Sequence, residues 1–428
     1  MDNELFNDHI SQGIALMSAE SYPAAKAEFE EAVRINVRSA EAYTHLGNAC
    51  ANLGQLDEAL AAFKNALTVE SSSAETLFSI ASIYLMKNDR LRAVEYYNKA
   101  EEAGFKRAEL YQILATLFFE IHDSAQALRN ITKAIAVAPF DGELRVLKAR
   151  IYLADNRYDE ALETLEDMQK VLPDAYEAYD LRAQIYSGLG KYDEALKIAE
   201  MGCSRFPDDA VLALTKLKVL VFMQNDTAAL ELLESMRNMP QYEAVVKEAV
   251  LQEAIVYLRK EDTTTALKIL TAVNEKLGGD ADVLYVLLDL YGKLDKHDKT
   301  SEIADKLIAL NPNYFYLYTA KFFKAHSAEQ MGKIDSAKAQ YRKLTSELRK
   351  ATINNPSFYE GYIYRLLCHT RIGEFKKALA LADYIENLHP DRADGHAYRH
   401  YIYKTMGDTE KAESEKQLAL KLNPGMNL

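Results

Sequence analysis

Apolar positions along the chain recur with the spacing of helices, and the helices recur with a fixed period. The segment LDEALAAF contains Ala59, and equivalent residues can be followed through the chain. The first seven equivalents are each 34 residues apart: Ala25, Ala59, Ala93, Ala127, Ala161, Ala195 and Ala229. Five more follow after gaps of 37, 34, 37, 41 and 34 residues: Ala266, Thr300, Ala337, Ala378 and Ala412. The period predicts twelve structural units.

Other residues keep step with these anchor positions and divide each unit into two helices. Apolar residues four and seven positions after the anchor return to the same helical face, as Phe63 and Ala66 do after Ala59. An aromatic residue often stands nine positions before the anchor, on the preceding helix. Glycines mark the turn between the helices: Gly54, Gly190, Gly332, Gly373 and Gly407. Units often end near a proline, such as Pro139, which cannot continue a helix.

This arrangement predicts stacked helical hairpins. A single hairpin cannot cover its own apolar stripes, whereas neighbouring hairpins cover one another. The unit at residues 40–70, AEAYTHLGNACANLGQLDEALAAFKNALTVE, resembles the tetratricopeptide repeat (TPR) signature. The resemblance extends from about Phe6 to Pro424. It implies an all-α fold, a right-handed α-solenoid (superhelix) of about twelve helix-turn-helix units.

Two departures from the period predict local changes in the stack. The longer gap before Ala266 contains RNMPQYEAVV, with Pro240 inside. We expect a joint here, between an N-terminal array of about seven units (1–239) and a continuous C-terminal array of about five (240–428); a slightly longer loop is the alternative. Between Ala337 and Ala378 there are seven extra residues, and their helical periodicity predicts an elongated second helix.

The composition narrows the classes of partner. The 428 residues include 64 acidic and 51 basic ones, a net charge of −13, with no basic stripe, so nucleic acid is not an expected partner. The sequence contains no run of eighteen apolar residues, so we expect no segment to be inserted into a membrane. The three cysteines lie far apart, which favours a reduced, cytoplasmic protein.

The sequence contains no pattern typical of catalysis. It lacks a phosphate-binding glycine loop, a GxSxG elbow and a zinc-ligand spacing, so we expect neither an enzyme nor a cofactor. His396 and His400 are four residues apart on one helix and are the best candidate metal ligands. No third ligand accompanies them, and packing or surface hydrogen bonding is the preferred interpretation.

The family resemblance implies that first helices line a concave groove that binds other proteins. Applied to this chain, it predicts an apolar, cation-bearing groove in units five to eight. The predicted partner-binding residues are Arg150, Leu153, Lys218, Val221, Phe222, Leu251, Ile255 and Arg259. The alternative is that these residues pack against neighbouring helices.

The expected function is therefore a non-catalytic protein–protein interaction scaffold or adaptor. It would bind a peptide or helical segment of a partner protein in the concave groove. The alternative is a peptide-responsive regulatory protein of the TPR type. The partner, the pathway and the oligomeric state are not specified by the sequence.

Overall fold

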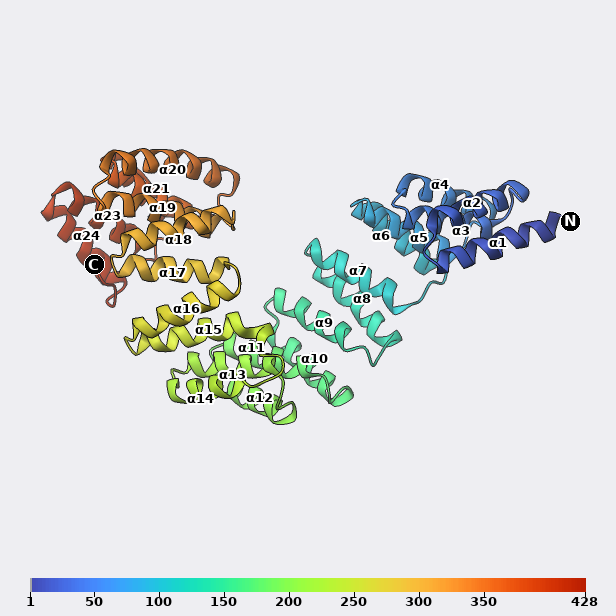
Figure 1. Ribbon diagram of the computed structural model, residues 1–428, viewed down its shortest axis with the longest axis horizontal. Coiled ribbons are helices and arrows are strands. Elements are labelled where there is room, and N and C mark those ends of the chain that lie inside the picture. Colours follow the sequence, from blue (N-terminus) through green and yellow to red (C-terminus); the bar gives the residue numbers. More distant parts are fainter. Residues whose placement is uncertain (1) are drawn as a thin grey trace. The chain divides into compact units, whose positions relative to one another are not determined.

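A computed structural model describes residues 2–428 (Figure 1). The described residues form 24 α-helices and no strand, and the helices group into two compact units, residues 1–207 and 208–428. The first unit contains α1 (Asp2–Ser18), α2 (Tyr22–Ile35), α3 (Ala40–Asn52), α4 (Leu56–Val69), α5 (Ala74–Met86), α6 (Arg90–Glu102), α7 (Ala108–Glu120), α8 (Ser124–Val137), α9 (Gly142–Ala154), α10 (Tyr158–Val171), α11 (Tyr176–Gly188) and α12 (Tyr192–Arg205).

The second unit contains the other twelve helices. These are α13 (Ala210–Phe222), α14 (Asp226–Met236), α15 (Tyr242–Arg259), α16 (Thr263–Lys276), α17 (Ala281–Lys293), α18 (His297–Ala309), α19 (Tyr314–Gln330), α20 (Ile334–Asn354), α21 (Tyr359–Arg371), α22 (Phe375–Leu388), α23 (Asp394–Met406) and α24 (Thr409–Leu422). Consecutive helices pair as α1–α2, α3–α4 and so on, which confirms the predicted all-α fold of helix-turn-helix units (Figure 1).

The anchor positions of the sequence pattern form the centre of the packing. All twelve are buried, eleven as alanine and one as Thr300. A small side chain there lets adjacent helices approach closely, and a larger residue on the second helix fills the space beside it. In the second hairpin this residue is Phe63, whose ring lies against Gly47 of α3. A Cβ atom on Gly47 would lie 2.6 Å from Cε1 of that ring, so the pair is matched in shape.

Each hairpin turn contains one residue in the left-handed backbone region. The twelve φ values lie between 54° and 81°. Five of these residues are the glycines that marked the turn in the sequence. The other seven are not glycine: Glu20, Asn88, His122, Asn156, Gln224, Glu261 and Asp295. Because a left-handed conformation costs an ordinary residue only about 1–2 kcal/mol, helix packing can impose it without glycine.

Ion pairs connect successive hairpins within each unit. Their partners lie about one repeat apart in sequence, at corresponding places on neighbouring hairpins. In the first unit they include Lys26–Glu58, Lys87–Asp57, Lys133–Glu101 and Arg205–Asp174. In the second they include Lys276–Glu243 and Arg259–Asp226. Most of these pairs are exposed, so each adds little to stability.

In the structure, a short loop that contains Pro240 joins two helices, and the extra residues before Ala378 lie within one long helix. Pro240 lies between α14 and α15, where Nη2 of Arg237 is 2.7 Å from Oε1 of the buried Glu253. The predicted boundary at residues 239 and 240 therefore falls inside the second compact unit, and a joint there stays a prediction. The extra residues before Ala378 are helical, as their periodicity predicted, because α20 is 21 residues long.

Candidate functional site

The first unit contains a cavity of about 790 Å³ between the first helices of three hairpins and the end of α10. Its volume is in the range of sites that hold small ligands or peptide side chains. Apolar residues form part of its lining: Val146, Leu147, Met168, Val171 and Leu172. Its charged residues are Glu143, Arg150, Asp174 and Glu177. Helices α7, α9 and α11 are all first helices, the helices on which the family resemblance predicts binding.

Local contacts fix the start of α9 beside this cavity. The side chain of Asp141 caps the helix by accepting from the backbone N–H of Glu143 at 3.0 Å. Nη1 of Arg145 donates to the carbonyl of Pro139 at 2.6 Å, which holds the loop between α8 and α9. A Cβ atom on Gly142 would approach Cε of Met168 to 3.0 Å, so glycine keeps this side of the cavity close-packed.

The charges of the cavity are only partly neutralised. Asp174 is paired with Arg205, with Oδ1 of the aspartate 2.6 Å from Nη2 of the arginine. Within residues 2–428, neither Arg150 nor the carboxylates of Glu143 and Glu177 form an ion pair. The cavity therefore offers an apolar surface, one available guanidinium and two available carboxylates.

The eight predicted partner-binding residues divide between the two compact units. Arg150 and Leu153 belong to the first unit and the other six to the second. Arg150 is exposed at the cavity, whereas the half-buried Leu153 packs against the apolar core of α9 and α10. Whether these two bind a partner stays a prediction.

In the second unit, the predicted residues differ strongly in exposure. Phe222 is 60% exposed and Ile255 is 43% exposed. Lys218 is half-buried, and so is Leu251, which packs against the core of its unit. Val221 is only 4% exposed, so its side chain belongs to the packing between helices.

Arg259 has a structural role within the second unit. Its Nη1 donates to the carbonyl of Val221 at 2.8 Å, and its Nη2 forms an ion pair with Asp226. Arg259 thus connects the end of α15 to the turn between α13 and α14. Its charge is already neutralised by the neighbouring hairpin.

Several cavity residues were not found by the sequence analysis. The family resemblance places binding residues on first helices, whereas Met168, Val171 and Leu172 belong to the end of a second helix and the residue that follows it. Glu143 and Glu177 lie in the first turns of α9 and α11. The apolar Val-Leu pair directly before Pro173 was the signal available in the sequence.

Tetratricopeptide repeat family models match five segments of the chain. The matched residues are 40–73, 74–103, 120–185, 176–209 and 318–347. The chain is a tetratricopeptide repeat protein. Repeats of this family typically form scaffolds for protein–protein interaction, and this is the broad functional class that the repeats imply for the chain.

Solved structures similar to this TPR protein include repeat proteins of several kinds. YrrB, described as a TPR protein with an unusual peptide-binding site, is 23% identical over 43% of this chain and 95% of its own, with a TM-score of 0.37. A tetratricopeptide repeat protein from Parabacteroides merdae ATCC 43184 is 20% identical over 58% and 98%, with a TM-score of 0.40. The APC/C hetero-tetramer Cut9–Hcn1 gives 12% identity over 97% and 93%, with a TM-score of 0.43. No curated protein matches the TPR chain.

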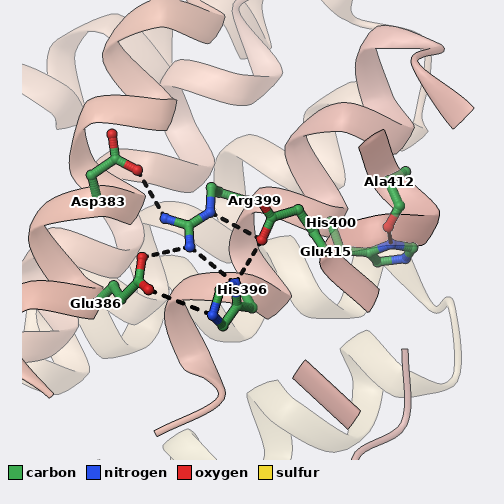
Figure 2. A network of polar contacts seen from close by, with 7 residues as sticks. All are labelled: Asp383, Glu386, His396, Arg399, His400, Ala412 and Glu415. Atoms are coloured by element: carbon green, nitrogen blue, oxygen red, sulfur yellow. Dashed lines mark hydrogen bonds and ion pairs between the residues drawn. The ribbon is translucent and has the colours of Figure 1, made fainter. Parts of the chain in front are cut away.

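The two candidate metal ligands of the TPR array do not point at a common site (Figure 2). Nδ1 of His396 lies 2.7 Å from the carboxylate of Glu415, beside the guanidinium of Arg399. Nδ1 of His400 donates instead to the backbone carbonyl of Ala412, at 2.8 Å. Each histidine thus has its own partner. Across residues 2–428, no three His, Cys, Asp or Glu side chains are grouped so as to hold a metal ion.

We expect two other histidines to make the second unit of the TPR array sensitive to acid. Burial lowers the pKa of His326 and of His369 below the ordinary value of about 6.5. The unfolded chain therefore binds protons at these sites before the folded one, and stability falls as the pH drops below about 6.5. We expect the thermal unfolding midpoint to fall between pH 7 and pH 5, and to fall less in a variant with both histidines changed to asparagine. An equal fall in both proteins, measured by circular dichroism, would contradict this assignment.

Among the described helices of the TPR array, none is both long enough and apolar enough to cross a membrane.

Proposed function

We propose that this chain is an adaptor whose first unit binds an extended or helical segment of a partner protein in the cavity between α7, α9, α10 and α11. The observation that carries the proposal is the combination of an open apolar surface with charged groups that no neighbour neutralises. A peptide needs both, because apolar burial supplies affinity and charged groups set orientation.

The lining indicates the chemistry of the bound segment. An apolar side chain would contact Val146, Leu147 and Val171. A basic side chain beside it would pair with Glu143 or Glu177, and Arg150 would donate to carbonyl or carboxylate oxygens of the peptide. Because the cavity has three carboxylates and one guanidinium, we expect it to select segments that combine an apolar anchor with lysine or arginine.

The second unit would supply a separate contact in this proposal. Phe222 and Ile255 are large, exposed apolar residues of α13 and α15, where the groove was predicted. Lys218, Val221, Leu251 and Arg259 are less accessible or already paired, so we assign them to support of this surface. A cytoplasmic location also belongs to the proposal.

Selection of random peptides on the intact protein tests the proposed cavity. We expect the enriched peptides to carry an apolar residue next to lysine or arginine. A Glu143→Lys, Glu177→Lys double variant should bind the best peptide roughly tenfold more weakly in fluorescence anisotropy, since it removes two charge pairs.

Glu163→Lys is the matched control, because Glu163 is exposed on α10 and does not line the cavity. It should leave the affinity within about twofold of the original value. Selected peptides without basic residues, or an equal loss in the control, would contradict the proposal.

A further inference from the structure

Positive charge gathers at one place in this acidic protein, a cleft between α20, α21 and α22. The cleft has a volume of about 330 Å³. Its charged and titratable residues are Arg342, Arg349, Arg365, His369, Glu374 and Lys377. Four permanent cations thus face one carboxylate, although the whole chain has a net charge of −13.

The single carboxylate is already occupied. Oε2 of Glu374 lies 2.9 Å from Nζ of Lys377 and accepts a hydrogen bond from Nδ1 of His369 at 2.7 Å. Within the described part of the chain, none of Arg342, Arg349 and Arg365 forms an ion pair. Three guanidinium groups therefore lack a counter-charge among residues 2–428.

Arg365 shows most clearly that a partner group is missing. Its Nη1 donates to Oγ1 of Thr352 at 3.3 Å, while its buried Nε has no hydrogen-bond partner among residues 2–428. Burial and the nearby charge of Arg349 lower the pKa of this guanidinium. The three buried arginines have other partners. Arg145 donates to the backbone carbonyl of Pro139, Arg182 pairs with a glutamate although its Nε is also unsatisfied, and Arg399 pairs with three carboxylates. An unneutralised, partly buried guanidinium is unfavourable unless an anion binds it.

The elongation of α20 extends the cleft. Most second helices in this chain have 13 or 14 residues, and a 14-residue helix starting at Ile334 would end at Glu347. Arg349 and Thr352 lie in the additional turns. The extension thus supplies one cation of the cleft and the hydroxyl that orients Arg365.

We propose that this cleft binds the phosphate group of a small phosphate-bearing molecule. A phosphate dianion matches the excess of positive charge, and its oxygens accept the parallel N–H groups that guanidinium presents. The volume is near the lower limit for small-molecule sites. This site is independent of the peptide cavity, which lies in the other compact unit.

An adjoining cavity gives room for the organic part of such a molecule. It has a volume of about 410 Å³ and shares Arg365, His369 and Lys377 with the cleft. Its other lining includes Tyr362, Leu381 and the partly exposed ring of Tyr384. A flat apolar group next to the phosphate would cover this tyrosine.

Calorimetric titration of the full chain at low salt tests the site, with inorganic phosphate, phenyl phosphate and benzoate as probes. We expect phosphate to bind, phenyl phosphate to bind more tightly, and benzoate to bind more weakly than both. Arg349→Gln and Arg342→Gln should each weaken phosphate binding roughly tenfold, because each removes a charge-assisted contact from an exposed position that does not hold the fold.

Lys350→Gln provides the matched control, since Lys350 is exposed, adjacent to Arg349 and outside the cleft lining. It should change the affinity by less than about twofold. Arg365→Lys, which keeps the charge but loses the planar fork, should also weaken binding while circular dichroism shows an unchanged fold. Absence of phosphate binding, equal binding of benzoate, or an equal loss in the Lys350 variant would overturn the proposal.

Discussion

Replacement of Phe63 by alanine is expected to destabilise the first unit by about 3–5 kcal/mol, the largest effect we predict for a single substitution. The ring is only 1% exposed and fills the space above Gly47, where no side chain can take its place. Because repeat arrays unfold through neighbouring interfaces, the loss should appear as an earlier transition of the first unit rather than of the whole chain. Urea unfolding followed by circular dichroism measures it.

A second substitution shows whether the shape of this pair is responsible. Gly47→Ala should destabilise the original protein by about 1–3 kcal/mol, because the new methyl group would overlap the ring of Phe63. In the Phe63→Ala background the same change should have a much smaller effect, since the ring is gone. Additive effects of the two substitutions would show that Gly47 and Phe63 do not act as a pair.

Replacement of Arg399 by methionine is expected to loosen the last two hairpins by roughly 2–3 kcal/mol. Its guanidinium is 10% exposed and lies 2.8 Å from Asp383 and 3.1 Å from Glu415, with Glu386 as a third partner (Figure 2). Without it, Asp383 of α22 would lose its ion-pair partner, and Glu386 and Glu415 would keep only their contacts with His396. The value is below that of a fully buried pair because Asp383 is 62% exposed and solvent screens its charge.

Hydrogen exchange distinguishes this effect from a general loss of charge. Amides of α23 and α24 should lose protection in the Arg399 variant, while those of α20 should change little. Arg392→Met is the control, because its pair with Asp394 involves a side chain that is 52% exposed. The control should lose less than about 0.5 kcal/mol, and equal losses in the two variants would contradict a special role for Arg399.

The sequence was sufficient to predict the repeat architecture, because that architecture depends on periodic burial. The anchor alanines are buried as their 34-residue spacing requires. The turns were less visible: glycine marks five of the twelve left-handed residues, while Gln224 and Glu261 adopt the same conformation without a local signal. There the conformation follows from the packing of the two helices, which no short segment encodes.

The candidate sites were harder to predict, because they depend on which side chains meet across helices. The family resemblance led to Arg150, which lines the cavity, but also to Val221, which is buried, and to Arg259, which is paired with Asp226. The cations of the α20–α22 cleft are mixed with acidic residues in the sequence. Only the fold brings Arg342, Arg365 and Lys377 to one place.

The ion pairs between successive hairpins bear on how such an array can change during evolution. Each pair joins corresponding places on adjacent repeats, as Lys26–Glu58 and Lys133–Glu101 do, but the signs and residue types differ from one junction to the next. A duplicated, deleted or transposed repeat would retain its apolar contacts and yet meet a neighbour with unmatched charges. The ion pairs therefore distinguish one junction between repeats from the next, although each contributes little to stability.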